Sequence, residues 1–233
     1  MGHVTVVGGC RAKAPVTYQA NFADNTWEQI IDACHKNKVP DTWVVGNSKT
    51  MLINGTEYQI DIIGKGHDDY ADGSGKAPLT FQMHDCYGAR LRMNDPSTNS
   101  GGWTSCAMRS THLPAILALM PTEVQSGIRE VNKLTSAGNQ STTINTTADK
   151  LFLLSEIEVF GRDDYSVSGE GTQYDYYKAG NSKVKKLNGG ANPWWERSPQ
   201  GSNSTDFCIV NSGGDAAYTG SANAIFMAFG FCF

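Results

Sequence analysis

Residues 192–214 have the sequence "NPWWERSPQGSNSTDFCIVNSGG", and residues 224–233 end the chain with "AIFMAFGFCF". The first stretch joins two adjacent tryptophans and an acid–base pair to a run of small polar residues. The second stretch has no polar residue after Phe226, which is typical of a buried strand. We therefore expect a fixed C-terminal strand that supports the polar segment from behind.

The composition indicates a lightly charged globular chain. It has 233 residues, of which 39% are hydrophobic and 18% charged, with a net charge of -4. This length fits one large domain or two small ones. A nucleic-acid partner requires a basic surface, which the chain lacks, so we expect none. No apolar run approaches the ~20 residues of a membrane span, and residues 1–18 lack the pattern of a signal peptide. We therefore expect synthesis in the cytoplasm and no membrane insertion.

The cysteines do not follow a metal-binding or disulfide pattern. Their spacings are wide and irregular, and none forms a C-x-x-C pair, whereas secreted disulfide scaffolds are shorter and denser in cysteine. We expect reduced and mostly buried thiols, and a bridge between Cys208 and Cys232 stays open as an alternative. The six cysteines are Cys10, Cys34, Cys86, Cys106, Cys208 and Cys232.

The hydrophobic pattern predicts a mixed α+β chain with two or three helices early and irregular short-stranded sheets later. Asn25, followed three residues later by Glu28, fits the capping box of a first helix. Asn54-Gly55 separates two strand-like runs and predicts a tight hairpin turn. Pro121 fits the first turn of a further helix over residues 121–134.

Two clusters of polar residues have side chains that metal ions accept. Residues 67–73, "HDDYADG", collect oxygen ligands, but Tyr70 interrupts the alternation that a calcium loop requires, and we favour a solvated turn. His84, Asp85 and Cys86 lack a second cluster that would complete a zinc site. We therefore expect no cofactor, with a structural calcium ion as the remaining alternative. We also expect structural roles for all five histidines.

Glu156 and Glu158 alternate with apolar residues in a segment that fits a strand or a short helix. Carboxylate pairs can act as acid and base. On a strand, however, these two side chains share one face, where they are more often solvated or paired with arginine. Arg109 and Arg197 are candidate buried partners. Such a pair would orient loops rather than catalyse, since an arginine fork holds a carboxylate in a fixed geometry.

Trp194 and Trp195 are the largest apolar side chains in the second half of the chain. On a strand, adjacent side chains point to opposite faces. One tryptophan would then enter the core, and the other would stack on a sugar or a partner. The alternative, that both cover the core, has equal weight.

The segment 201–226 lacks long flexible side chains. It contains no Lys, Arg, Glu, Gln, Met or Trp, so ordering its surface costs little side-chain entropy. Its Tyr, Ser, Gly and Asn are the residues that antibody loops use for adaptable contacts. Every residue type in the segment can also be reached from an asparagine codon, AAC or AAT, by changes at adenines alone. An ordinary glycine- and serine-rich loop would have a similar composition.

A set of motifs that covers residues 25–233 resembles, in order and spacing, a domain family of gut bacteria and their phages. That family looks like the C-type lectin fold, in the subtype shared with formylglycine-generating enzymes. "LLSEIEVFG" is similar to that group's "LPTEAEWE" element, and the closing "AFGFCF" takes the place of its "GFR" strand. Many members are variable proteins of diversity-generating retroelements, in which a reverse transcriptase rewrites adenine positions near the 3′ end of the gene. The motifs are "GGWTSCAMR", "LPAILALMP", "DKLFLLSEIEVFG", "GEGTQYDYY", "WWERSP", "DFCIVNSGG" and "MAFGFCF".

The resemblance implies a domain division and a set of diversified residues. Residues 1–20 would form an N-terminal linker or leader, and residues 21–233 a C-type lectin-like domain with a variable region at about 194–233. The diversified, ligand-binding residues would be Thr205, Asp206, Ile209, Gly213, Asp215, Ala217, Tyr218, Thr219 and Ile225. The scaffold residues would be Trp194, Trp195, Arg197, Ser198, Phe207, Val210, Gly230 and Phe231.

The resemblance also implies a binding protein with a hypervariable C-terminal face. It would be the receptor-binding tip of a phage or prophage tail fibre, in the virion, or a binder on the bacterial cell surface. Its partner would be a host-surface protein or a glycan, and a homotrimer or fibre assembly would fit the first setting. The alternatives are an oxidase similar to formylglycine-generating enzymes and a ligand-free structural protein of the virion. Those enzymes need two redox cysteines close in sequence, whereas Cys208 and Cys232 are far apart, so we expect no enzymatic activity.

Overall fold

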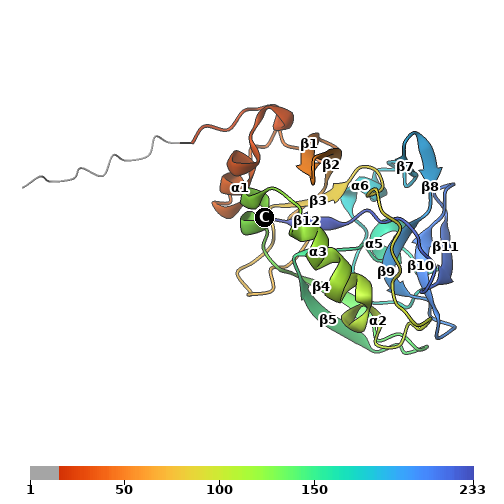
Figure 1. Ribbon diagram of the computed structural model, residues 1–233. Coiled ribbons are helices and arrows are strands. Elements are labelled where there is room, and N and C mark those ends of the chain that lie inside the picture. Colours follow the sequence, from red (N-terminus) through yellow and green to blue (C-terminus); the bar gives the residue numbers. More distant parts are fainter. Residues whose placement is uncertain (1–15) are drawn as a thin grey trace, which may run out of the picture.

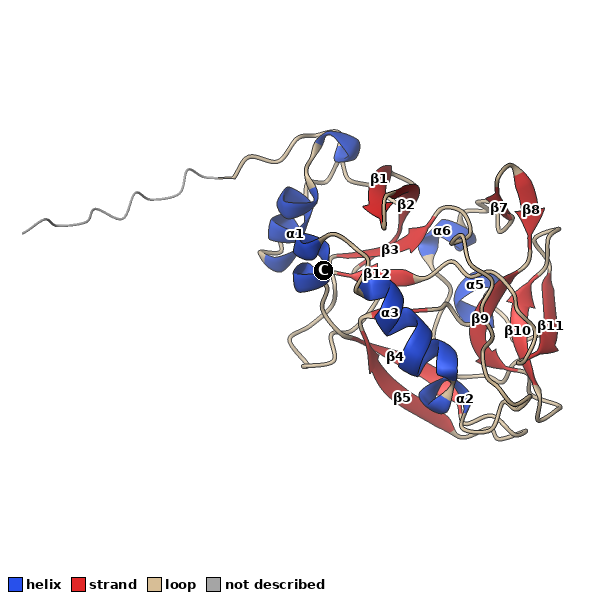
Figure 2. Ribbon diagram, viewed as in Figure 1, coloured by secondary structure: helices blue, strands red, loops and turns tan. Residues whose placement is uncertain are grey.

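The computed structural model of the protein describes residues 16–233 and has a mixed α+β fold, in which short helices and short strands are interspersed (Figures 1 and 2). The helical segments are η1 (Phe22–Asp24), α1 (Trp27–His35), α2 (Gly102–Ser105), η2 (Met108–His112), α3 (Leu113–Leu117), α4 (Thr122–Gly127), α5 (Glu156–Phe160) and α6 (Asp175–Lys178). The strands are β1 (Ser48–Ile53), β2 (Thr56–Lys65), β3 (Leu79–Met83), β4 (Val131–Ser136), β5 (Ile144–Asp149), β6 (Leu151–Phe152), β7 (Lys185–Leu187), β8 (Gly190–Asn192), β9 (Trp194–Pro199), β10 (Asp206–Val210), β11 (Ala216–Gly220) and β12 (Gly230–Cys232).

The last strand of the chain lies inside the largest sheet, whose order is β1-β2-β3-β12-β6. β12 pairs antiparallel with β3 on one side and with β6 on the other. Every residue from 227 to 233 is buried, and the Tyr70 hydroxyl donates a hydrogen bond to the Phe233 carbonyl oxygen. The expectation of a fixed C-terminal strand is therefore confirmed.

A second sheet, with the order β11-β10-β9, supports the segment 201–226. It lies at the opposite end of the molecule from α1 (Figure 1). All six residues of β9 are buried, and β10 is buried except at Asp206. β11 is the outer strand and is half-buried or exposed along its length. The sheet thus passes from a buried strand to an open one.

The first helix forms where the sequence predicts it, but its cap differs by one residue. Thr26, not Asn25, is the N-cap of α1. Its hydroxyl accepts a hydrogen bond from the Gln29 N–H, and its own N–H donates to the side-chain oxygen of Gln29. Asn25 is buried instead. Its amide nitrogen donates to the carbonyl oxygens of Asn21 and Phe22 and so closes the turn before the helix.

The Asn54-Gly55 hairpin is confirmed, whereas the helix expected over residues 121–134 ends early. Asn54 and Gly55 both have positive φ (48° and 77°) between the paired strands β1 and β2, as a two-residue hairpin turn requires. α4 ends at Gly127, and residues 131–136 form β4, which pairs with β5. Buried and exposed residues alternate at the start of this segment, as in a strand, and at one of the buried positions the side chain of Lys133 meets buried acids.

The packed part of the chain begins before residue 21. The Tyr18 hydroxyl donates to Asp32 at 2.7 Å, and the Tyr18 ring lies edge-on to Trp43. The predicted linker, residues 1–20, therefore includes residues that pack on the domain, and its first 15 positions, with Cys10, lie outside the described residues.

A buried ion pair joins β9 to α5. Arg197, fully buried in β9, donates two hydrogen bonds to the carboxylate of Glu158, one of them at 2.9 Å. Its remaining donors bond the carbonyl oxygens of Leu134 at 3.0 Å and Leu153 at 2.9 Å. The pairing of Arg197 with Glu158 confirms one of the two partners expected from the sequence. The other, Arg109, pairs with Asp149 instead.

The same carboxylate extends this contact into a network. Lys133 of β4 is 1% exposed, and its ammonium lies 2.8 Å from Glu158 and 2.7 Å from Asp68. The Tyr174 hydroxyl completes the group, since it donates a hydrogen bond to Asp68 and accepts one from the Lys133 ammonium. The segment 67–73, expected as a solvated turn, is therefore solvated only in part, because Lys133 draws Asp68 into the core. We call these five residues, Arg197, Glu158, Lys133, Asp68 and Tyr174, the ion network.

We expect Glu158→Gln to lower the free energy of unfolding by about 3–5 kcal/mol, because it leaves two buried cations with too little negative charge. Burial would raise the pKa of Glu158, but Arg197 and Lys133 hold it below its usual range, so the carboxylate is charged at neutral pH. Urea denaturation at pH 7 measures the loss. Glu130→Gln, at an exposed position, is the control, and equal stability of the two variants would contradict the role assigned to the network.

We expect Gly230→Ala to destabilise the protein by about 1–3 kcal/mol through overpacking. A Cβ at Gly230 would lie 2.8 Å from the Phe81 carbonyl oxygen and 2.9 Å from the Phe152 ring. Gly190→Ala is the matched control, since the nearest atom to a Cβ there is 3.7 Å away. Thermal unfolding of both variants checks this, and a Gly230→Ala midpoint equal to that of the control would show that β12 can move to make room.

Candidate functional site: the surface of residues 201–226

The candidate site rests on the tryptophan pair of β9. Trp194 and Trp195 are both fully buried. The indole N–H of Trp194 donates to the Lys183 carbonyl oxygen at 2.9 Å, and that of Trp195 donates to the Leu91 carbonyl oxygen at 2.8 Å. Of the two alternatives, the one in which both tryptophans cover the core is therefore correct. These two hydrogen bonds fix β9 to the segments around Lys183 and Leu91.

The loop between β9 and β10 is held from behind by Asn99. This side chain is fully buried, and its amide nitrogen donates to the carbonyl oxygens of Asn203 at 3.0 Å and Asp206 at 2.9 Å. The Asn203 side chain in turn accepts from the N–H groups of Thr205 and Asp206. The side chains of Asn99 and Asn203 thus bond the backbone N–H and C=O groups of the loop. The side chain of Thr205 is exposed at the surface.

The turn between β10 and β11 is closed by its own asparagine. The Asn211 side-chain oxygen accepts from the N–H groups of Gly213 at 2.8 Å and Asp215 at 3.0 Å. The Asn211 N–H also bonds the Asp215 carbonyl oxygen. Asparagine side chains commonly bond backbone two residues onward in this way. Gly213 and Asp215 are both exposed.

The segment after β11 is attached to residues 91–98. Ser221 is fully buried, and its carbonyl oxygen accepts from the N–H of Met93 while its hydroxyl accepts from the N–H of Thr98. Ile225 exchanges backbone hydrogen bonds with Leu91 in both directions. Most of these bonds join main-chain atoms, so few side chains are needed to hold the segment in place.

The cross-strand register separates the nominated residues onto two faces. Ile209 lies opposite Ala217, and Thr219 follows two residues later on the same face. Asp206 and Tyr218 lie on the other face. The nominated residues of β10 and β11 therefore do not form one flat surface. The outer edge of β11 pairs with no other strand among the described residues.

The structure exposes four of the nine nominated residues, half-buries four and buries one. Tyr218 is 46% exposed, and its ring lies edge-on to Tyr165, 5.0 Å between centroids. Ile209, by contrast, is 7% exposed and belongs to the hydrophobic core. Its assignment as a surface residue is corrected here: it packs within the sheet as part of the scaffold. The exposed set is Thr205, Gly213, Asp215 and Tyr218, and the half-buried set is Asp206, Ala217, Thr219 and Ile225.

The nominated scaffold residues are all buried. This holds for the aromatic side chains, for the arginine of the ion network and for the small residues between them. The set is Trp194, Trp195, Arg197, Ser198, Phe207, Val210, Gly230 and Phe231. Sequence reasoning missed the buried Asn99, which holds the first loop, because a single asparagine in a polar segment gives no signal of burial.

A group of buried carboxyls lies within and beside the same sheet. Glu196 of β9 is fully buried, and neither of its carboxyl oxygens has a hydrogen-bond partner among the described residues. Burial, with Glu156 and Glu170 nearby, raises the pKa of Glu196 well above its usual range. Burial also raises the pKa of Glu170 to about 7. The Glu156 carboxylate accepts from the N–H groups of Tyr165 and Ser166 and fixes that loop.

The cysteines and histidines do not form a reactive or metal-binding group in the part of the chain that the structure describes. Cys34, Cys86, Cys106, Cys208 and Cys232 are free and buried, and no bridge joins Cys208 to Cys232. Burial raises the pKa of both of these thiols well above the usual value. Among residues 16–233, no group of three or more His, Cys, Asp or Glu is arranged to hold a metal ion.

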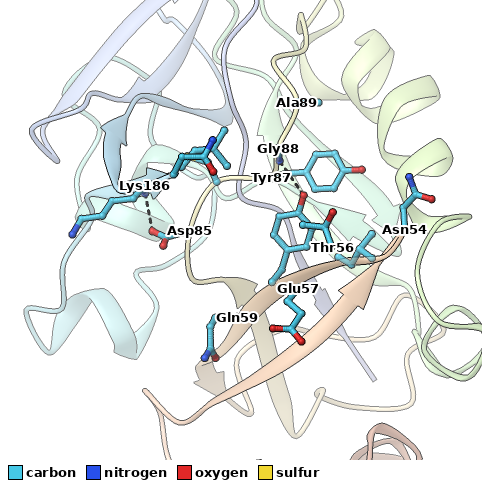
Figure 3. Close-up of a pocket in the computed structure, with 14 residues that line it drawn as sticks. Asn54, Thr56, Glu57, Gln59, Asp85, Tyr87, Gly88, Ala89 and Lys186 are labelled. Carbon is cyan, nitrogen blue, oxygen red and sulfur yellow. Dashed lines mark hydrogen bonds between the residues drawn. The ribbon is translucent and has the colours of Figure 1, made fainter.

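The candidate site is a surface rather than a hollow. A hollow of ≈590 Å³ lies between the β1–β2 hairpin and β7 and takes no residue from 201–226 (Figure 3). Another, of ≈410 Å³, borders the segment through Ala224 alone. An exposed surface of small polar side chains fits the area of a macromolecule better than a small ligand, which prefers a concave site.

Comparison with known proteins assigns the chain to a family without giving it an activity. Residues 80–228, more than half of the chain, match the family described as "Domain of unknown function (DUF6273)". The chain belongs to this family. The comparisons with curated proteins and with solved structures found no match.

Among the helices of residues 16–233, each is too short or too polar to cross a bilayer.

We expect the wild-type protein to lose stability as pH rises from about 4.5 to about 7. Glu170 has a pKa of about 7 in the folded chain against an ordinary 4.5. The folded state therefore keeps a proton that the unfolded state releases, and the stabilisation present below 4.5 is lost as pH rises through 7. Glu170→Gln should show a shallower decline. Urea denaturation between pH 4.5 and 8 measures both slopes.

Glu130→Gln, an exposed exchange of the same type, serves as the control for this slope and should keep the wild-type pH dependence. Parallel curves for the wild type and Glu170→Gln would show that Glu170 does not hold its proton in the folded state.

Proposed function

We propose that the protein is a binding protein whose residues 201–226 present a diversified surface to a macromolecular partner. The proposal includes a C-type lectin-like fold of the formylglycine-generating-enzyme subtype and diversification by a retroelement. It also includes a place at the tip of a phage or prophage tail fibre, or on a bacterial cell surface. The partner is a host-surface protein or glycan. Assembly into a homotrimer or fibre fits the tail-fibre setting.

One observation supports this function above the others: the exposed side chains of the surface are separate from the bonds that hold it in place. Backbone atoms, together with the side chains of Asn99, Asn203 and Asn211, close the two loops. Thr205, Gly213, Asp215 and Tyr218 are exposed beyond them. Exchanges at such positions usually change stability by less than about 0.5 kcal/mol, so the surface can vary while the fold stays constant.

The genetic part of the proposal is tested on DNA. The region beside the gene should contain a near-copy of codons 194–233 that differs at template adenines, next to a reverse-transcriptase gene. Amplicons of the 3′ end from a population should vary at the codons of Thr205, Asp215 and Tyr218 and stay constant at those of Trp195 and Phe207. If the region contains no such copy and the amplicons show no adenine-biased variation, diversification by a retroelement is refuted.

The binding part is tested with the fluorescently labelled full chain on a panel of intact gut bacterial strains, read by flow cytometry. We expect one or more strains to bind the wild type. The triple variant Thr205→Ala, Asp215→Ala and Tyr218→Ala should lose at least about tenfold in affinity, as removal of interface anchors does. Thr50→Ala with Asp41→Ala, both exposed elsewhere, is the matched control.

This test has two outcomes that oppose the proposal. One is a panel without any bound strain. The other is binding that the triple variant and the control weaken equally, which would place the partner on a different surface. Circular dichroism of the triple variant shows that a loss of binding is not a loss of fold.

A further inference from the structure

A separate hollow of ≈590 Å³ opens between three segments that are distant in sequence (Figure 3). It is lined by residues 53–59 of the β1–β2 hairpin, by residues 85–89, and by residues 186–188 at the β7–β8 turn. Its volume lies within the roughly 300–1,000 Å³ of small-ligand sites. It shares no residue with the surface of residues 201–226.

Main-chain hydrogen bonds fix the walls of this hollow to one another. The Cys86 N–H donates to the Lys186 carbonyl oxygen at 3.0 Å, and the Lys186 N–H donates to the Asp85 carboxylate at 2.7 Å (Figure 3). The Tyr87 N–H bonds the Met227 carbonyl oxygen at 2.8 Å and so ties the hollow to the buried C-terminal segment. A site held in this way is already formed before a ligand arrives, which lowers the cost of binding.

A stacked pair of tyrosines supplies the apolar wall. The rings of Tyr58 and Tyr87 lie 5.4 Å apart between centroids, with 26° between their planes. The Gly88 N–H donates to the Tyr58 hydroxyl at 3.3 Å, and a Cβ at Gly88 would lie 3.1 Å from that oxygen. Glycine therefore allows the chain to pass close to the ring. Tyr87 also packs against the core ring of Phe229.

The polar groups of the hollow are free to meet a ligand. The Tyr87 hydroxyl forms no hydrogen bond to any residue of the described range 16–233, and burial raises the pKa of Tyr87, so it remains a neutral donor. The side chains of Glu57, Gln59 and Asn188 are exposed and likewise form no hydrogen bond within that range. Together these groups offer a phenol, a carboxylate and two amides.

This combination fits a hydroxyl-rich ligand. A hydroxyl group both donates and accepts, so one sugar can use a carboxylate, an amide and a phenol at the same time. The C–H face of a sugar ring is apolar and packs against an aromatic ring, whose polar handle bonds the hydroxyls. The charged side chains at the hollow are the carboxylates of Glu57 and Asp85 and the ammonium of Lys186, so negative charge is in excess, which disfavours an acidic ligand.

We propose that this hollow binds a neutral carbohydrate. Tyr58 and Tyr87 pack against the sugar, and Glu57, Gln59 and the Tyr87 hydroxyl bond its hydroxyl groups. The site is distinct from the surface of residues 201–226 and does not depend on the function proposed for that surface.

An array of immobilised neutral and acidic oligosaccharides, probed with the labelled full chain, tests this proposal. We expect binding to neutral oligosaccharides, and titration calorimetry then gives the affinity for the strongest of them. Tyr87→Phe and Glu57→Gln should each weaken this affinity about 3- to 10-fold, the effect of one lost hydrogen bond. Tyr87→Phe keeps the stacked ring, so the fold is preserved. Glu130→Gln, exposed outside the hollow, should leave the affinity unchanged.

The proposal is overturned if no neutral oligosaccharide binds, if only acidic ones bind, or if both variants bind as the wild type does. Tyr218→Ala separates it from the function proposed above. Sugar binding that Tyr218→Ala removes and Glu57→Gln leaves intact belongs to the surface of residues 201–226 and refutes a site in the hollow. Sugar binding that only the hollow variants weaken, with cell binding unchanged, supports two separate sites.

Discussion

The contact between Arg197 and Glu158 is the interaction on which the rest of the structure depends. Arg197 joins β9 to the carbonyl oxygens of two other segments, and Glu158 caps its own short helix through the Ser155 N–H while it receives Arg197 and Lys133. A five-residue helix such as α5 has little stability of its own. Its position is set by these charges, and β4, α5, β9 and the segment around Asp68 meet at one point as a result.

Such a network is costly to bury, and its value lies in geometry more than in net stability. Ions lose hydration when they leave water, and only well-placed partners compensate. Here each cation has a carboxylate within 3 Å, and Arg197 also satisfies main-chain oxygens. A β9 shifted by one residue would turn Arg197 to the opposite face of the strand, away from Glu158, and bring Glu196 or Ser198 into its place. The position of β9 is therefore fixed by charge as well as by hydrophobic packing.

The buried base of β9 and the C-terminal strand differs in side-chain chemistry from the exposed surface of residues 201–226. The base uses tryptophans, an arginine and a central last strand, all of which tolerate few substitutions. The surface uses short side chains whose ordering costs little entropy, on loops that main-chain bonds and three asparagines already close. The tyrosine-lined hollow between β2 and β7 is built on the same base, since Tyr87 bonds Met227 next to β12. The two proposed binding sites thus share one scaffold without sharing residues.

The sequence by itself determined the features that depend on neighbouring residues. The α+β class, the Asn54-Gly55 turn, the first helix and the buried C-terminal strand all follow from local pattern, because periodicity and turn chemistry act within a few positions. The resemblance of the motifs selected the scaffold positions, and all of them are buried. Ile209 was misplaced because the resemblance assigned it a diversified position, although it stands within the apolar run of residues 207–210, which β10 buries.

Only the tertiary structure decided the features that depend on partners distant in the chain. Lys133 belongs to a strand that pairs with β5 and not to the helix expected over residues 121–134, and Asp68 and Glu158 neutralise its charge inside the core. Asn99 holds a loop more than a hundred residues away. The tyrosine-lined hollow brings together three separate segments. Hydrogen bonds and ion pairs between distant residues leave no periodic trace in the sequence, because their energy depends on a proximity that folding alone creates.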